Sequence, residues 1–136
     1  MKASKLRVGN RIKRRSTGTS HIVTTPILQE IESGRHDYEY ETISVNLLKR
    51  AGFTCKELTN RTMCFLSFEV GENNYFMRLS YWFSPSGELE SCFIGLDRGE
   101  PNEHFENNHI KYVHLLQNLY MVETGKELAI KQLDET

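Results

Sequence analysis

The strongest constraint on the fold is a two-residue alternation of side chains in the middle of the chain. Residues 63–70 and 75–83 both alternate in this way, and both faces of the alternation carry aromatic rings. Residues 71–74 provide a turn between them. Residues 84–87, with proline and glycine, provide a second turn before another strand-like segment, residues 88–96. Segments joined by such short turns pair with their neighbours, so the pattern predicts an antiparallel meander.

The C-terminal segment 107–128 predicts one complete amphipathic helix, with the sequence NNHIKYVHLLQNLYMVETGKEL. Asn107 and Asn108 offer an N-cap. Thr124 and Gly125 provide the end, because glycine enters the left-handed conformation without steric cost. Residues at three- and four-residue spacing form its apolar side: Tyr112, Leu115, Leu116, Leu119 and Val122.

A shorter helix is expected before the meander, capped by Ser44 and closed by Gly52. Leu47, Leu48 and Ala51 form its buried side. Helices and strands are segregated along the chain, so the predicted class is α+β: an antiparallel meander, a short middle helix, and the C-terminal helix packed on one face. At 136 residues we expect a single domain spanning residues 1–136.

The N-terminal part predicts smaller elements. Residues 6–15 indicate an extended entry and a basic strand, followed by a turn at residues 16–20. Residues 21–32 are β-branched at both ends with Pro26 in the middle, which indicates an edge strand or a bent one. The polar, acidic residues 97–108 predict a loop.

Composition indicates a folded protein, with 38% hydrophobic and 26% charged residues. No apolar run approaches the roughly 18 to 20 residues of a membrane span. The first residues lack the apolar centre of a secretion signal, so we expect a cytoplasmic protein that does not contact a membrane. Cys55, Cys64 and Cys92 form no CxxC pair, which favours buried free thiols.

Charge is distributed unevenly. The first 29 residues contain seven basic and no acidic side chains, whereas the remaining 107 contain 10 basic and 18 acidic ones. Such a separation can steer a charged partner to one end of the molecule. In the other interpretation the basic segment lies against the protein's own acids.

The motifs of common enzymes are missing from the sequence. It has neither a GxSxG nucleophile elbow nor a glycine-rich phosphate loop, so we expect no enzymatic activity and no cofactor. His109 and His114 are five residues apart and diverge on a helix, which argues against a metal site there. A loop-and-helix metal site would use His104, Glu106 and His109. A metal-dependent nuclease would use Glu88, Glu90, Asp97 and Lys111.

A second stripe on the C-terminal helix contains Ile110, His114, Gln117 and Met121. Its polar residues either bond to loop backbone at the edge of the core or recognise a partner. Nucleic-acid contact is a separate hypothesis, based on backbone attraction and base stacking. Its candidate residues are Arg7, Arg11, Lys13, Arg14, Arg15, Arg78 and Trp82.

Three segments carry a family resemblance: LRVGNRI at residues 6–12, LLKRAGF at 47–53, and above all IKYVHLLQNLYMVETGKEL at 110–128. With them the chain resembles a family of short, largely uncharacterised proteins encoded by bacteriophages and integrated mobile elements of bacteria. It departs from the family before the middle helix, where residues 42–44 replace a proline-containing approach. The resemblance implies an origin in such elements, and no established activity comes with it.

The leading hypothesis is a non-catalytic phage or mobile-element protein that binds a host component and occludes its surface. Small phage proteins of this kind include inhibitors of nucleic-acid-guided defence nucleases, the anti-CRISPR type. The partner would be a bacterial protein or protein–RNA complex, and the contacts would be Arg11, Lys13, Arg14, Arg15, His114 and Gln117. The alternative is an accessory protein that binds RNA or DNA directly, and the third hypothesis is the metal-dependent nuclease.

Overall fold

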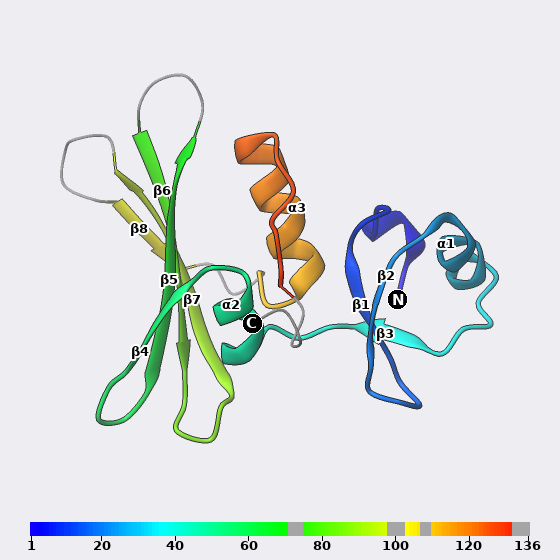
Figure 1. The fold of residues 1–136 in the computed structure, drawn as a ribbon, viewed down its shortest axis with the longest axis horizontal. Coiled ribbons are helices and arrows are strands. Elements are labelled where there is room, and N and C mark those ends of the chain that lie inside the picture. The colour runs from blue at the N-terminus through cyan, green and yellow to red at the C-terminus, as the bar shows by residue number, and fades with distance from the viewer. Residues whose placement is uncertain (71–74, 98–102, 107–109, 132–136) are drawn as a thin grey trace.

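The structure is a computed structural model that describes residues 1–70, 75–97, 103–106 and 110–131 (Figure 1). In chain order its elements are η1 (Ala3–Lys5), β1 (Arg11–Arg14), β2 (Ser20–Ile22), α1 (Thr25–Glu32), β3 (Tyr38–Tyr40), α2 (Val45–Arg50), β4 (Thr54–Glu57), β5 (Thr62–Val70), β6 (Tyr75–Phe83), β7 (Leu89–Asp97), β8 (Glu103–Glu106) and α3 (Val113–Thr124). Its strands form a three-stranded sheet of order β2-β1-β3 and a five-stranded sheet of order β4-β5-β6-β7-β8. The predicted α+β class is confirmed.

The predicted meander forms the three central strands β5, β6 and β7 of the five-stranded sheet, and β4 and β8 add its two edges. Helices α2 and α3 pack on one face of this sheet (Figure 1). Alternate side chains of β5, β6 and β7 point toward the helices and form the larger core: Cys64, Phe68, Val70, Met77, Leu79, Tyr81, Phe83 and Cys92. The Tyr81 hydroxyl donates a hydrogen bond of 3.0 Å to the carbonyl of Ile110, just before α3. This inward face fixes the register, because a slip of one residue would turn every apolar side chain outward.

Part of the predicted loop at residues 97–108 is a strand. β8 pairs with β7, with Ile94 opposite Phe105 and Gly95 opposite His104. The prediction was wrong here because an edge strand is held by backbone hydrogen bonds, which a polar, acidic sequence does not reveal. Residues 98–102 and 107–109 lie outside the described part of the chain.

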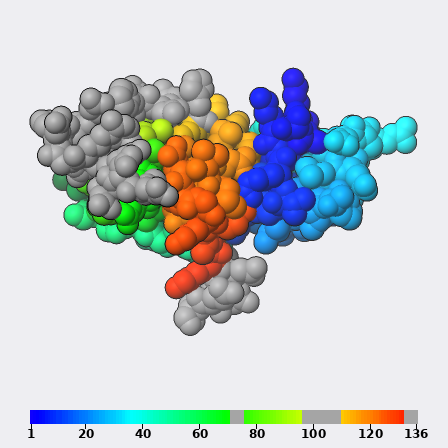
Figure 2. All heavy atoms as spheres, turned by 90° about the horizontal axis from the view of Figure 1, so that it is seen from above, coloured from blue at the N-terminus to red at the C-terminus, as the bar shows by residue number. Residues whose placement is uncertain are grey.

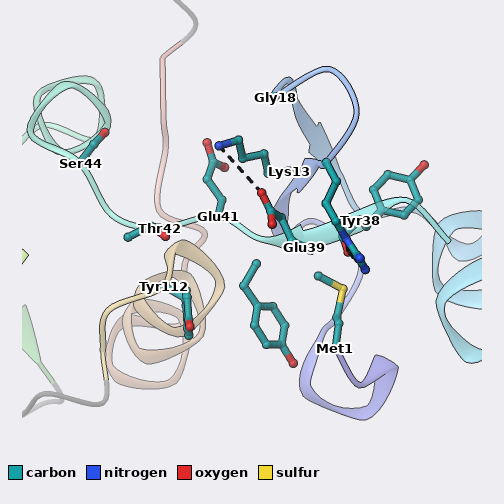
Figure 3. Close-up of a pocket in the computed structure, with 11 residues that line it drawn as sticks. Met1, Lys13, Gly18, Tyr38, Glu39, Glu41, Thr42, Ser44 and Tyr112 are labelled. Carbon is teal, nitrogen blue, oxygen red and sulfur yellow. Dashed lines mark hydrogen bonds and ion pairs between the residues drawn. The ribbon is translucent and has the colours of Figure 1, made fainter. Parts of the chain in front are cut away.

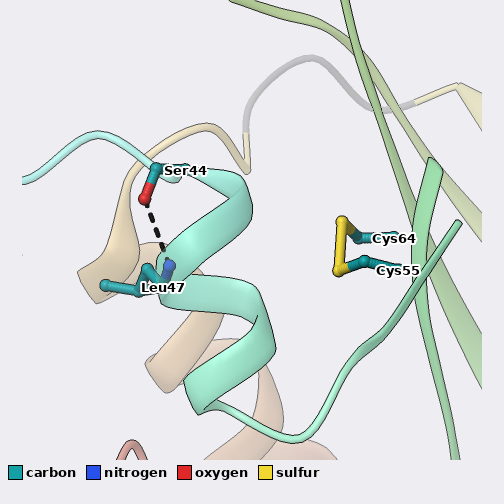
Figure 4. The surroundings of a disulfide bond; sticks show 4 residues. All are labelled: Ser44, Leu47, Cys55 and Cys64. Atoms are coloured by element: carbon teal, nitrogen blue, oxygen red, sulfur yellow. Dashed lines mark hydrogen bonds between the residues drawn. A yellow bond between two sulfur atoms is a disulfide. The ribbon is translucent and has the colours of Figure 1, made fainter. Parts of the chain in front are cut away.

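Helix α2 confirms its prediction in each part. The Ser44 hydroxyl accepts a hydrogen bond of 3.2 Å from the Leu47 amide, as an N-cap does (Figure 4). Leu48 is fully buried, and Ala51 is 6% exposed. Gly52 follows with φ +91°, in the left-handed region that favours glycine.

Helix α3 ends as predicted at Gly125, which has φ +73°. Its start differs from the prediction, because it begins at Val113 with Tyr112 as N-cap residue, while Asn107 and Asn108 lie outside the described residues. The segment between β3 and α2 sets this start, because the Val113 amide donates a hydrogen bond of 2.8 Å to the Glu41 carbonyl. The predicted apolar side was wrong at its far end, since Val122 is 78% exposed.

The N-terminal part forms its own small core under β1, β2 and β3: Leu6, Ile12, Val23, Ile31 and Tyr38. The predicted strand at residues 21–32 was largely wrong, because β2 ends at Ile22 and α1 follows. Thr24 caps α1 by accepting from the Ile27 amide at 3.5 Å. Pro26 lies in the first turn, where backbone amides have no hydrogen-bond partner within the helix, so the amide proton that proline lacks costs nothing.

Helix α3 lies between the two cores and joins them. Figures 1 and 2 show it against the five-stranded sheet on one side and the N-terminal residues on the other. Asn10, which is fully buried, donates to the Asn118 side chain at 2.9 Å and to Gln117 at 3.5 Å. The single domain over residues 1–136 stays a prediction, with α3 as the element that connects its two parts.

Cys55 and Cys64 form a disulfide between β4 and β5 (Figure 4). They face each other in the register, with their Cα atoms 4.1 Å apart. The expectation of free thiols was therefore wrong for this pair, because sequence spacing did not show that the two residues are cross-strand neighbours. It is confirmed for Cys92, which is a buried free cysteine whose thiol pKa is raised by burial to about 11.

Candidate functional site

The outward face of the five-stranded sheet gathers aromatic and basic side chains. Phe65 lies opposite Ser80, and Ser80 lies opposite Phe93, so the two rings stand in one row across three strands. Trp82 lies one row further along the same face. No helix of the described residues covers this side (Figure 1). We call this surface the open face; it consists of Phe65, Phe76, Arg78, Trp82 and Phe93 with the neighbouring cations Lys56 and Arg61.

Basic groups lie over the rings of the open face. The guanidinium carbon of Arg61 is 4.5 Å from the centroid of the Trp82 ring, and that of Arg78 is 4.3 Å from the Phe65 ring. The Lys56 ammonium is 5.7 Å from the same Phe65 ring. These distances are those of cation–π attraction, about 0.5–1 kcal/mol for each exposed pair. The face is thus a set of flat, partly solvated planes that alternate between rings and guanidinium groups.

The sequence indicated only part of this surface. Arg78 and Trp82 were candidates of the nucleic-acid hypothesis, and the structure brings them to one face. Phe65, Phe93 and Arg61 were missed as candidates. Their signal was the presence of aromatic rings on both faces of the alternation, but the strands alone did not show which face the helices cover.

The basic residues of β1, and Arg15 directly after it, are engaged by groups of the protein itself. Arg11 and Glu41 form an ion pair at 3.2 Å, with side chains only 13% and 14% exposed. Lys13 lies 3.9 Å from Glu39. Arg14 donates to the Tyr38 hydroxyl at 3.0 Å, and Arg15 donates to the Tyr38 carbonyl at 3.1 Å.

Arg7 also pairs with an acid of the protein itself, and this acid lies far from it in the sequence. Its guanidinium makes a two-pronged contact with the carboxylate of Glu127, one bond measuring 2.9 Å. This hydrogen-bonded pairing raises the pKa of Arg7 and lowers the pKa of Glu127. For these basic residues the structure therefore favours the second interpretation of the uneven charge, in which the segment lies against the protein's own acids.

His114 and Gln117, which the leading hypothesis offered as partner contacts, are buried in the structure. They are 2% and 4% exposed and point toward the N-terminal part. The Gln117 side chain accepts from the Arg11 amide at 2.8 Å and donates to the Gly9 carbonyl at 3.2 Å. This is the loop-backbone bonding that the first interpretation expected, because buried polar groups need partners.

The His114 ring is held by stacking. Its centroid is 4.4 Å from that of Tyr40 and 5.9 Å from that of Tyr112. Nδ1 is buried and has no hydrogen-bond partner among the described residues. Burial consequently lowers the pKa of the imidazole, since a charged ring would lose its hydration there.

This burial predicts a pH dependence of stability. The unfolded chain binds the His114 proton with a pKa near 6.5, whereas the folded protein keeps the ring neutral to lower pH. The contribution of the neutral His114 ring to the free energy of unfolding is therefore fully present above pH 6.5. It decreases as the pH falls through the lowered pKa, with a slope of at most about 1.4 kcal/mol per pH unit. Urea unfolding at a series of pH values measures it. His114→Phe retains the stacking and should reduce the slope; equal slopes in both proteins would contradict the assignment.

A cavity of about 570 Å³ lies where the N-terminal sheet meets the start of α2 (Figure 3). Tyr38, Tyr112 and Ser44 line it, together with the Lys13–Glu39 pair. Its charged groups are of both signs and bond to each other, so they do not specify the charge of a ligand. We therefore place the candidate site on the open face.

The residues proposed for metal binding do not come together where the structure describes them. The described residues contain no group of three or more histidine, cysteine, aspartate or glutamate side chains that could hold a metal ion. Lys111 lies with its ammonium 5.4 Å from the Tyr112 ring. The side chains of His104, Glu106 and Asp97, and all of His109, lie outside the described part of the chain.

Comparison with known proteins adds no relative. No protein-family model matches the chain, and neither the curated proteins nor the solved structures gave a significant match. In the part of the chain that the structure describes, no helix is both long and apolar enough to cross a membrane.

Proposed function

We propose that the protein is a non-catalytic binding protein of phage or mobile-element origin. It acts in a bacterial host by occluding the surface of a nucleic-acid-guided defence nuclease, as anti-CRISPR proteins do. The observation that supports this proposal is the open face, where arginines lie over Trp82 and Phe65 on an uncovered side of the sheet. Tryptophan and arginine are enriched among the residues that contribute most to binding energy at interfaces.

The scaffold suits an occluding surface. β5 pairs with β6 from Thr62 opposite Phe83 to Val70 opposite Tyr75, and β7 pairs with β6 on its other side. The backbone under the open face is therefore fixed before a partner arrives. Less conformational entropy is lost on binding than when a loop must become ordered.

The contacts proposed on the open face differ from the N-terminal contacts that the sequence predicts. Arg11 is a poor contact because its charge is already bound by Glu41 in a largely buried pair. Reversing this charge would weaken the protein itself, so the loss of partner capture would not identify a contact. Lys13, whose side chain is 43% exposed, is a suitable control on the N-terminal sheet.

The test is a cleavage assay with a purified, guide-loaded nuclease and its target. We expect the wild-type protein to reduce cleavage in proportion to its concentration, and Trp82→Ala to lose at least tenfold in potency. Lys13→Ala should inhibit as the wild type does. If a panel of guided nucleases of different types shows no inhibition and no complex by size-exclusion chromatography, the proposed function is wrong.

A further inference from the structure

We propose that the open face binds single-stranded nucleic acid, with bases stacking on its rings and its cations contacting phosphates. The inference deepens the proposed function, since it names the chemistry that this same face would contact in a nucleic-acid-guided nuclease.

The spacing of the rings suits consecutive bases. Phe65 and Trp82 are diagonal neighbours on β5 and β6, because Phe65 pairs with Ser80, two residues before Trp82. Diagonal neighbours on one face of an antiparallel pair are about 7–8 Å apart, a separation within reach of large side chains. Phe93 continues the row on β7. A strand of unpaired bases that crosses β5, β6 and β7 thus meets successive aromatic planes.

Charge on the face is mixed with the rings, as stacking proteins require. Arg61 and Arg78 each lie over one ring, so a positive charge that can contact a phosphate stands beside each of these stacking planes. Lys56 adds a third positive charge next to Phe65. The acid at an outward position of β5 is Glu69, which lies opposite Phe76 at the other end of the face from Trp82.

The shape favours single strands over duplexes. A duplex buries its base faces in the helix stack, and a protein reads it through a helix, ribbon or loop that enters a groove. The open face is a sheet surface on which the rings of Phe65, Trp82 and Phe93 are half-buried between neighbouring strands. Such rings reach only bases that are unpaired, whether in RNA or in DNA.

The chain contains a single tryptophan, and it lies on the open face. Tryptophan fluorescence, excited selectively over that of the tyrosines, therefore reports on this surface alone. We would titrate the full chain with 12-nucleotide oligouridine, oligothymidine and a duplex of equal length, at two salt concentrations. Stacking of a base on Trp82 is expected to quench its fluorescence with both single strands, and the affinity should fall as salt rises. The RNA and DNA arms show whether the 2′-hydroxyl matters.

Binding by variants is measured with fluorescein-labelled oligonucleotides, and folding is checked by circular dichroism and thermal melting. Trp82→Ala and Phe65→Ala should each weaken binding about tenfold or more, whereas Trp82→Phe should retain most of it. Arg78→Ala should weaken binding and flatten the salt dependence, because one phosphate contact is lost. Lys13→Ala and Val122→Ala, at exposed positions elsewhere, should bind as the wild type does.

Several results would overturn the inference: no single-strand binding at low salt, equal or tighter binding of the duplex, or full binding by folded Trp82→Ala and Arg78→Ala proteins. Its fate is separable from that of the proposed function. Nuclease inhibition that depends on Trp82 without any oligonucleotide binding would mean that the open face contacts protein. Oligonucleotide binding without nuclease inhibition would support the inference and contradict the proposed function.

Discussion

Gln117→Ala is expected to lower the free energy of unfolding by about 3 kcal/mol, because Gln117 ties α3 to β1. The substitution removes the acceptor of the Arg11 amide and the donor to the Gly9 carbonyl. Each of these part-buried backbone groups then loses its partner, at a cost of about 1–3 kcal/mol, less where water enters. Urea unfolding followed by circular dichroism measures the change.

Two further variants make this prediction specific. Val122→Ala changes an exposed residue of the same helix and should alter stability by less than about 0.5 kcal/mol. Asn10→Ala removes the neighbouring amide, which bonds to both Gln117 and Asn118. Because the amides share one network, the double variant should lose less than the two single losses added together. A change near zero for Gln117→Ala would contradict the prediction that its two backbone hydrogen bonds hold α3 to β1.

Sequence reasoning succeeded where one segment contains all the causes of its structure. α2 has its cap at Ser44, its buried side at Leu47 and Leu48, and its end at Gly52, all within ten residues. The three central strands of the meander could also be predicted from the sequence, because alternation and turn residues are local signals. Such elements need little from the rest of the chain.

Elements that depend on distant partners were missed. α3 starts at Val113 because residues 111–113 bond to the backbone of residues 41–43, which no local cap could indicate. β8 exists through its ladder with β7. α1 was obscured by Pro26, since the same proline that excludes a central strand position is well accommodated in a first helical turn.

The candidate site shows the same division. The hydrophobic pattern of α3 left open whether His114 and Gln117 bond to backbone or contact a partner, because it did not reveal the second core that these two residues face. Likewise, Trp82 and Tyr81 both belong to an alternating aromatic strand, and only the position of the helices decides that Tyr81 is buried and Trp82 lies on the open face. Placement of function therefore required the tertiary structure.

Reduction of the Cys55–Cys64 disulfide is expected to lower the free energy of unfolding by about 2.5 kcal/mol, since it frees a loop of about ten residues in the unfolded chain. The measurement compares urea unfolding of the oxidised and reduced protein, with the thiols counted by mass spectrometry. In Cys55→Ala the reductant should have no effect, because Cys92 has no partner for a disulfide in the fold. An unchanged unfolding midpoint in the fully reduced wild type would contradict the prediction.

The redox state of this disulfide depends on the compartment in which the protein acts. Disulfides persist in oxidising compartments, whereas the predicted location is a reducing bacterial cytoplasm. With the disulfide reduced, only the backbone ladder would hold β4 to β5; this ladder runs from Thr54 opposite Phe65 to Glu57 opposite Thr62. β4 carries Lys56, which lies over the Phe65 ring, while Arg78 approaches that ring from β6. Reduction should thus leave Trp82 fluorescence and its quenching by oligouridine nearly unchanged, and a large loss of quenching would show that the open face requires the cross-link.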